Sequence, residues 1–154
     1  MVQVRTMNPL DLEAVLRLGN AVPEAPHWAR AVYERILSAE PHHKHIFIVE
    51  EGERLLGFIA AQIIFDVCEL ESIVVDITTR RCGVGRALLH TLFDWASSNN
   101  AVRVQLEVRS GNTRAIDFYC KSGFTQEGLR RAYYRDPEED AVLMGRALVP
   151  IPDR

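Results

Sequence analysis

The chain has 154 residues, of which 47% are hydrophobic and 25% are charged, and its formal net charge is −3. This length predicts a single domain over residues 1–154, and the small negative charge gives no electrostatic basis for binding nucleic acid. The apolar stretches are too short to span a membrane, and the three cysteines have the spacing of neither a disulfide framework nor a zinc site, so we expect a cytoplasmic protein without a metal.

Hydrophobic periodicity and turn residues predict an α/β (α+β) chain with the element order β-α-α-β-β-β-α-β-α-β-β. The predicted strands cover residues 2–7, 46–50, 55–65, 68–76, 102–108, 124–128 and 141–148. The predicted helices cover residues 9–20, 27–40, 84–98 and 113–122. Asn8 is expected to cap the first helix, and Pro41 to end the second. The short connections between residues 46 and 76 require antiparallel pairing of the strands there.

Residues 80–86 contain the most informative pattern in the chain, because they follow an apolar run and open the helix predicted at 84–98. The first N–H groups of a helix have no partners within the helix and lie at the positive end of its dipole. Glycines let an anion approach the backbone closely, and arginines add positive charge. We therefore expect a phosphate-bearing cofactor to contact Arg80, Arg81, Cys82, Gly83, Val84, Gly85 and Arg86.

The segment at residues 80–86 has three alternative interpretations: a dinucleotide-binding fold, a P-loop and a plain helix start. A dinucleotide-binding fold also begins Gly-x-Gly, and Glu107 lies at about the distance, ~20 residues, where that fold needs an acidic residue. However, Leu88 stands in place of the third glycine, and residues 76–82 separate the glycines from the preceding strand. The Gly-Lys-Ser/Thr string of a Walker P-loop does not occur. A plain helix start with nearby arginines is the simplest alternative.

The order of the elements, together with the Arg80-x-x-Gly83-x-Gly85 segment and the later block Asn112…Phe118-Tyr119…Gly123-Phe124, resembles the GNAT acetyltransferase superfamily over residues 2–148. Within it, the chain is similar to the RimI type in the strings Leu106-Glu107-Val108-Arg109, Arg130-Arg131-x-Tyr133-Tyr134 and Glu139-Asp140-Ala141 followed by Met144. The resemblance implies a mostly antiparallel central sheet of about seven strands, four flanking helices and a splayed pair of strands at the cofactor site. It also implies acetyl-CoA as the co-substrate, without a metal.

For the cofactor, the resemblance implies that backbone groups of Ile73, Val74 and Val75 pair with the pantetheine chain like an extra strand. It places Asn112 against the cofactor, which is compatible with capping the helix that follows. It also implies that Tyr119 is the acid that protonates the leaving thiolate. A lone tyrosine in such an apolar setting would otherwise be interpreted as a core residue.

Glu107 is the candidate general base. Apolar and polar residues alternate along its predicted strand, so Glu107 lies on the polar face. The residues alone are equally compatible with a catalytic carboxylate and with a carboxylate on a solvated face. The resemblance favours the catalytic role, because the RimI type has a glutamate here that acts through water. A weak base is sufficient for a protein N-terminal amine, whose pKa is about 8, against about 10.4 for lysine.

The resemblance implies that the acceptor is a protein N-terminus, the N-terminal alanine of a small-subunit ribosomal protein. The candidate acceptor-binding residues are Trp28, Tyr33, Tyr133 and Tyr134, although core packing explains Trp28 and Tyr33 equally well. Two alternatives stay open: a GNAT enzyme that acetylates a small-molecule amine, and a non-catalytic acyl-CoA-binding regulatory domain. The presence of both Glu107 and Tyr119 argues against the second. The sequence does not define an oligomeric partner.

Overall fold

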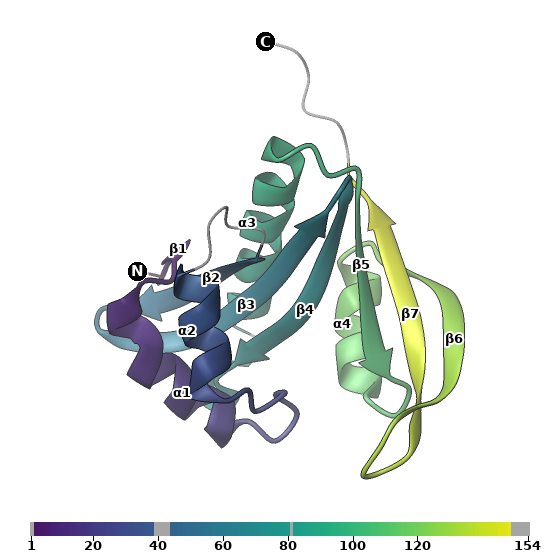
Figure 1. Cartoon of the computed structure of the whole chain (residues 1–154), viewed down its shortest axis with the longest axis horizontal. Coiled ribbons are helices and arrows are strands. Elements are labelled where there is room, and N and C mark those ends of the chain that lie inside the picture. The colour runs from purple at the N-terminus through teal and green to yellow at the C-terminus, as the bar shows by residue number, and fades with distance from the viewer. Residues whose placement is uncertain (1, 39–43, 81, 149–154) are drawn as a thin grey trace.

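The computed structural model describes residues 2–38, 44–80 and 82–148. Within these residues the chain forms four α-helices and a seven-stranded sheet with the strand order β1-β2-β3-β4-β5-β7-β6, as Figure 1 shows. The strands are β1 (Val2–Thr6), β2 (Lys44–Glu51), β3 (Arg54–Ile64), β4 (Val67–Val75), β5 (Arg103–Arg109), β6 (Thr125–Tyr134) and β7 (Glu139–Ala147). The helices are α1 (Leu12–Ala21), α2 (Arg30–Ser38), α3 (Val84–Ser98) and α4 (Thr113–Lys121). Short 3-10 turns precede α1 and α3.

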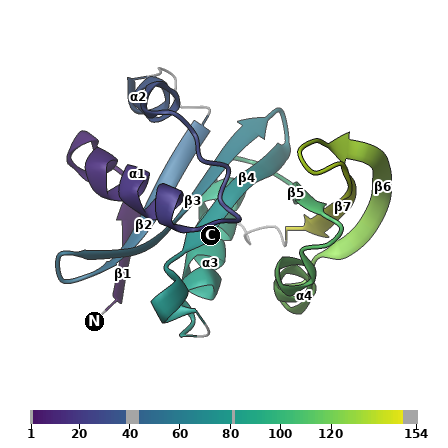
Figure 2. The same ribbon diagram turned by 90° about the horizontal axis from the view of Figure 1, so that it is seen from below.

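The helices cover both faces of the sheet, with α1 and α2 on one side and α3 and α4 on the other (Figure 2). Successive side chains along each strand point to opposite faces of the sheet, so each face packs against an apolar core of its own. The core under α1 and α2 contains Val15, Leu18, Tyr33, Ile36, Ile48, Phe58 and Val74. The core under α3 and α4 contains Val49, Ile59, Leu88, Leu92, Val104, Leu106, Tyr119 and Met144.

β4 and β5 are neighbours in the sheet, but they separate along most of their length. Their parallel pairing joins Val67–Glu69 to Arg103–Gln105. Among the described strands, β4 then continues to Val75 beside β3 alone, and β5 continues to Arg109 beside β7 alone. The two ribbons diverge towards the lower edge of Figure 1. This is the expected splayed pair, and the predicted fold class is confirmed.

A bulge in β4 changes which face its side chains occupy. The register with β3 shifts between Leu70 and Ser72, which leaves Glu71 as the extra residue. Leu70 before the bulge and Ile73 after it therefore both face the core under α3, although their spacing in the sequence is odd. Val74 joins the core on the opposite face. The segment that is expected to meet the cofactor lies just beyond this bulge.

The turn that leads into α1 is held by a capping box and an arginine. Asn8 Oδ1 accepts a hydrogen bond from the N–H of Leu10 at 2.8 Å, and the N–H of Asn8 donates to Asp11 at 2.8 Å, which confirms Asn8 as a cap. Arg5 on β1 donates to both carboxylate oxygens of Asp11 at 2.8 Å and to Glu50 on β2 at 2.8 Å. The bonds from Arg5 lower the pKa of Asp11.

Several element boundaries differ from those predicted, and two of the differences bear on the candidate site residues. α2 begins at Arg30 and not at residue 27, because His27 has a φ of 54°, in the left-handed region, and so is not a helical residue. The predicted end of this helix at Pro41 lies outside the described residues. The sixth strand does not end at residue 128 but continues to Tyr134, with a further register shift between Arg130 and Tyr134. Tyr133 and Tyr134 are therefore strand residues that lie beside β7 in the same hairpin.

Candidate active site

The helix start that is expected to bind an anion is formed by Gly83 and Val84. Gly83 is the N-cap of α3 and has a φ of 83°, which glycine adopts without a steric penalty. A Cβ built on Gly83 would meet no atom of the described chain within 4 Å, so the glycine faces open space. The Val84 side chain is buried in the core under α3, which leaves its backbone as the part available to a ligand.

Gly85 has a packing role that the sequence analysis missed. A Cβ at this position would lie 3.1 Å from Cζ of Phe118, closer than such contacts normally are. Phe118 is on α4, so the glycine lets α3 and α4 approach each other. The lack of a side chain at position 85 is thus required by close helix packing, in addition to any role in admitting an anion.

The charged residues around this helix start are only partly covered. Arg80 lies just before the helix start, with 23% of its side chain exposed, and Arg86 and Cys82 are exposed. Arg81 lies outside the described residues. The preceding turn is fixed by Asp76, which accepts a hydrogen bond from the N–H of Thr78 at 2.8 Å. The structure therefore combines guanidinium groups with a helix N-terminus, as expected for a site that binds phosphate.

The second expected contact with the cofactor is the edge of β4. Ile73, Val74 and Val75 pair with β3 on one side, and all three side chains pack into the two cores. Their other edge faces the diverging β5. Side-chain packing and backbone pairing do not conflict here, because the former uses the faces of the strand and the latter uses its edge.

Glu107 projects from β5 into a group of residues supplied by β6. Its side chain is 33% exposed, and its Oε1 lies 3.7 Å from a guanidinium nitrogen of Arg130. The nearby Glu107 carboxylate, as a hydrogen-bond acceptor and then as a charge, raises the pKa of the Tyr133 phenol. The guanidinium of Arg130 also lies over the Tyr133 ring, with Cζ 5.3 Å from the ring centroid.

Tyr134 connects this group to Tyr119. Burial, followed by the charge of Glu107, raises the pKa of Tyr134, and the guanidinium of Arg109 lies 4.4 Å from the centroid of its ring. Tyr119 is buried, with 6% exposure, and its pKa is raised by burial and then by Tyr134. The ring of Tyr119 packs against Phe124, with centroids 5.6 Å apart. The phenol of Tyr119 therefore stays protonated at neutral pH.

Asn112 begins α4, where its Oδ1 accepts a hydrogen bond from the N–H of Ala115 at 3.3 Å. The predicted capping role is confirmed. Its predicted contact with a cofactor stays a prediction. The cap places Asn112 directly after β5, at the end of the sheet where β4 and β5 have diverged.

The remaining acceptor candidates lie in the core under α1 and α2, on the face of the sheet to which Glu107 also projects. Tyr33 is 2% exposed and packs edge-on against Phe58, with ring centroids 6.2 Å apart. Trp28 lies against Tyr33 at 5.7 Å and is partly buried on the same core. Hence the structure brings Tyr133 and Tyr134 together with Glu107 and gives Tyr33 a packing role, while an acceptor contact of Trp28 stays a prediction.

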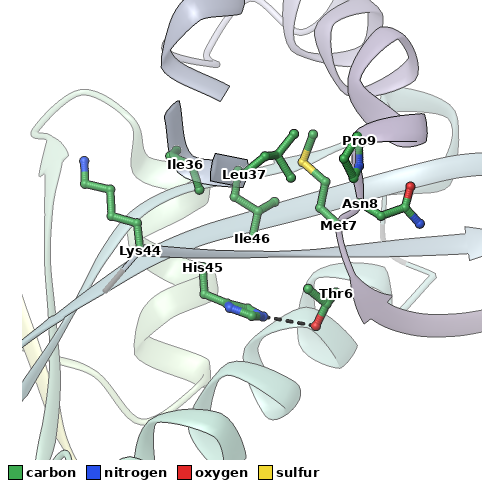
Figure 3. Close-up of a pocket in the computed structure, with 9 residues that line it drawn as sticks. All are labelled: Thr6, Met7, Asn8, Pro9, Ile36, Leu37, Lys44, His45 and Ile46. Atoms are coloured by element: carbon green, nitrogen blue, oxygen red, sulfur yellow. Dashed lines mark hydrogen bonds between the residues drawn. The ribbon is translucent and has the colours of Figure 1, made fainter. Parts of the chain in front are cut away.

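A pocket of about 260 Å³ lies away from all of these residues. It is formed by β1, the turn after it, α2 and β2, as Figure 3 shows. Its lining residues are Thr6, Met7, Asn8, Pro9, Ile36, Leu37, Lys44, His45 and Ile46. Its wall lacks the strand edge, helix start and ionisable pairs described above, so we do not assign the reaction to it.

Acetyl-CoA fits the residues around α3 and β4 by its chemistry. Its phosphates match Arg80, Arg86 and the open helix start, its extended amide chain matches a strand edge, and its thioester matches a protonated buried phenol. Among the described residues, no group of three or more His, Cys, Asp and Glu side chains is placed to hold a metal ion. No helix in the described part of the chain is long and apolar enough to cross a membrane.

Several residues in this region were given no role from the sequence. Arg109 and Arg130 belong to the strings used for the resemblance, which were the available signal for them. Glu24 and Arg114 depend on ion pairs between distant segments, for which the sequence carries no local signal.

Comparisons with known proteins agree with this architecture. The model of the Acetyltransferase (GNAT) family matches residues 11–124. The chain is 36% identical over 147 residues to the [Ribosomal protein bS18]-alanine N-acetyltransferase of Escherichia coli (strain K12), which covers 94% of this chain and 96% of that protein. The crystal structure of the ribosomal-protein-S18-alanine N-acetyltransferase from Escherichia coli superposes with a TM-score of 0.86 and 28% identity, covering 100% and 98%. Chaetomium thermophilum Naa20 in complex with a bisubstrate analogue superposes with a TM-score of 0.83 and 25% identity, covering 95% and 86%.

A splayed sheet with a glycine-containing helix start beside it defines an N-acetyltransferase. The chain belongs to the GNAT acetyltransferase family, and its similarity to RimI-type enzymes is confirmed. Enzymes of this family use acetyl-CoA.

Proposed function

We propose that the protein transfers the acetyl group of acetyl-CoA to the α-amine of a protein N-terminus, and that its acceptor is the N-terminal alanine of a small-subunit ribosomal protein. The observation that carries this proposal is the placement of Glu107 beside Tyr133, whose ring packs against that of Tyr134 with centroids 5.1 Å apart. The buried phenol of Tyr119 lies near enough to Tyr134 for the two to interact electrostatically. Glu107 is on β5, the strand that the free edge of β4 faces. The relatives that acetylate the N-terminal alanine of ribosomal protein bS18 support this choice of acceptor.

In the proposed mechanism, Glu107 removes a proton from the α-ammonium of the acceptor through a water molecule. Its exposed carboxylate is compatible with a water between it and the amine. An N-terminal amine has a pKa of about 8, below that of a lysine side chain. A carboxylate is therefore a sufficient base to assist its deprotonation near neutral pH. The neutral amine can then attack the thioester carbonyl carbon and form the new C–N bond.

Tyr119 acts at the other end of the reaction. When the C–S bond breaks, sulfur gains negative charge, and the Tyr119 phenol donates its proton to it. Burial raises the pKa of Tyr119, so the donor is fully protonated before the reaction begins. The first proton taken from the amine leaves through Glu107, and the nitrogen loses a second proton to solvent after the C–N bond has formed. Solvent also returns a proton to Tyr119. The products are an N-acetylated chain, free CoA thiol and one released proton.

The edge of β4 is proposed to stabilise the charge that develops between these two steps. Acetyl-CoA supplies an activated acyl group as a thioester. A backbone N–H of the segment Ile73–Val75 points to the carbonyl oxygen and stabilises the oxyanion. Arg80, Arg86 and the N-terminus of α3 bind the phosphates, and the Gly83 backbone is accessible to them. Asn112 lies at the edge of the same site.

We also propose a cytoplasmic location, because the proposed acceptor is a ribosomal protein. The exposed free thiols of Cys82 and Cys120 are compatible with a reducing compartment.

The test uses three acceptors with the purified protein and acetyl-CoA: a peptide with a free N-terminal alanine, the same peptide blocked there but carrying an internal lysine, and spermidine as a small amine. Release of thiol gives the rate, and mass spectrometry locates the acetyl group. We expect acetylation of the first peptide at its α-amine and little reaction with the other two. A preference for spermidine would contradict the proposal in favour of a small-molecule enzyme, and no turnover with any acceptor would favour a binding domain.

A further inference from the structure

The carboxylate of Glu24 joins two arginines that are far away in the sequence. Its Oε2 lies 3.2 Å from a guanidinium nitrogen of Arg80, and its Oε1 lies 3.0 Å from one of Arg114. Glu24 belongs to the segment between α1 and α2, Arg80 immediately precedes the start of α3, and Arg114 is in the first turn of α4. One carboxylate thus connects three separate parts of the fold.

The location of this ion-pair group matters for the cofactor. The segment between α1 and α2 lies at the lower edge of Figure 1, the end at which β4 and β5 diverge. Arg80 reaches Glu24 from the β4 side of this opening and Arg114 from the β5 side. The side chains are accessible, because Glu24 is 43% exposed and Arg114 is 57% exposed. A ligand can therefore reach the pair of arginines.

The chemistry of the pair is that of a phosphate site. Two guanidinium groups converge on the two oxygens of one small anion, and Arg binds carboxylate and phosphate with the same fork geometry. Hydrogen bonds from its own backbone N–H and from Arg80 lower the pKa of Glu24, so this group is a carboxylate at neutral pH. The 3′-phosphate of CoA carries more charge than a carboxylate, and the pyrophosphate carries two charges over more acceptor oxygens, so either group would compete with Glu24 for both arginines.

We propose that Arg114 and Arg80 together bind a phosphate of the cofactor, and that Glu24 is the internal anion that holds these two arginines until the cofactor displaces it. This inference rests on the use of acetyl-CoA in the proposed function and adds to it a binding residue and a competitor.

The test measures CoA binding by calorimetry, without any acceptor, so that the readout does not depend on turnover. Glu24→Gln removes the competing charge and keeps the size of the side chain, and we expect CoA to bind roughly two- to tenfold more tightly. Arg114→Gln should weaken CoA binding by a similar factor. In the double variant, the gain from Glu24→Gln should be smaller, because one of the two arginines for which Glu24 competes is gone.

Glu13→Gln is the matched control, because Glu13 forms an exposed ion pair with Arg30 at 2.6 Å and contacts neither Arg80 nor Arg114 in that pair. We expect no change in its affinity for CoA. Dephospho-CoA identifies the phosphate: if Arg114→Gln weakens CoA but not dephospho-CoA, the pair binds the 3′-phosphate, and if it weakens both, the pair binds the pyrophosphate. Either result supports the proposal.

Unchanged or weaker CoA binding by Glu24→Gln would overturn the role of Glu24 as a competitor, and full affinity in Arg114→Gln would overturn the role of Arg114. If the unaltered protein itself did not bind CoA, the proposed function would fail together with this inference. Binding by the unaltered protein with no effect of either variant would reject this inference alone.

Discussion

The ring of Phe118 lies directly against Gly85, so that a Cβ on the glycine would be 3.1 Å from Cζ of the ring. Gly85→Ala should therefore push α3 and α4 apart, at a cost of roughly 1–3 kcal/mol, partly offset by the better helix propensity of alanine. Denaturant unfolding of Gly85→Ala, Phe118→Leu and the double variant measures the coupling. We expect the alanine to be less destabilising, or even stabilising, once Phe118 has been shortened. Equal effects of Gly85→Ala in both backgrounds would show that this contact does not limit the packing.

Gly83 can be tested with a substitution that combines backbone conformation and charge. Gly83→Asp places a carboxylate at the start of α3, where it would repel the phosphates of the cofactor. We expect CoA binding to weaken at least about tenfold, which corresponds to about 1.4 kcal/mol. Calorimetry of the folded variant measures this effect directly.

Gly52→Asp is a close control for Gly83→Asp. Gly52 has a φ of 63° in the turn between β2 and β3, and no atom lies within 4 Å of its Cβ position in the described chain. The two variants thus share the added charge and the left-handed backbone, but Gly52 lies in a hairpin turn and not at the start of a helix. A similar loss of affinity for CoA in both variants would contradict phosphate binding at the start of α3.

The hydroxyl of Tyr119 should matter more for turnover than for binding. Tyr119→Phe keeps the ring contacts with Phe118 and Phe124, and removes the proton donor only. We expect kcat to fall by about 10²-fold or more, while the Kd for CoA changes little, because charge on sulfur develops only in the transition state. Steady-state rates and CoA binding are measured on the same preparation, with the melting temperature as a check on folding. A normal kcat would leave Tyr119 as a core residue.

Glu107→Gln should give a defect that depends on pH. The substitution keeps a hydrogen-bond acceptor for Tyr133 but cannot accept a proton, so we expect kcat/KM to fall by roughly 10²–10⁴-fold at neutral pH. As the pH rises towards about 8, more of the acceptor amine is already neutral and the defect should shrink. Rates from pH 6 to pH 9 with an N-terminal alanine peptide test this.

A second glutamate provides the control for that experiment. Glu127 on β6 also pairs with an arginine, Arg103, and is similarly exposed. Glu127→Gln should leave the pH profile unchanged. A Glu107→Gln defect of constant size at every pH, or the same defect in Glu127→Gln, would contradict the role of Glu107 as a base.

The free energy of unfolding at acid pH should depend on Asp11. Hydrogen bonds from Arg5 lower the pKa of Asp11 in the folded protein, so its carboxylate is favoured in the folded state relative to the unfolded chain. This contribution is fully present above the unfolded pKa of about 3.9 and is lost as the pH falls below it through the folded pKa. Asp11→Asn should therefore be less stable than the unaltered protein at pH 6, and the difference should narrow towards pH 3.

Urea unfolding at several pH values measures this difference. Asp94→Asn is a suitable control, because Asp94 is 78% exposed and its partner His90, one turn away on the same helix, lies at 3.9 Å. This control should change stability little at either pH. If the difference in the free energy of unfolding between Asp11→Asn and the unaltered protein grew towards pH 3, Asp11 would not stabilise the folded state through a lowered pKa.

The sequence was sufficient for features whose signal is local. The strand order of the meander follows from short connections, Asn8 and Asn112 were correctly predicted as caps, and the start of α3 follows from its glycines. The local signal was insufficient at His27, because nothing in the residue type requires its left-handed backbone. The splayed pair was expected from the resemblance, since the residues of β4 and β5 do not themselves specify where pairing ends.

The surroundings of the candidate site depended on three-dimensional proximity. The alternation around Glu107 predicts that it is on the polar face of its strand, but the contact with Tyr133 requires the hairpin to fold back beside β5. The burial of Tyr33 was one of two interpretations, and the packing of α1 and α2 on β3 supports that one. The pairing of Glu24 with Arg114 spans 90 residues, a separation at which sequence patterns carry no information about contact.

The bulge at Glu71 gives β4 one residue more than the facing stretch of β3. The pairs on its two sides, Ala61 with Leu70 and Ala60 with Ser72, are consecutive along β3. Deleting Glu71 would therefore keep both pairs in register and leave every side chain from Ser72 to Val75 on its present face of the sheet. Deleting Ile73 would instead place Ser72 in the core under α3, where Ile73 packs now. In a library of single-residue deletions, loss of Glu71 should therefore be the deletion within β4 that leaves the most folded protein.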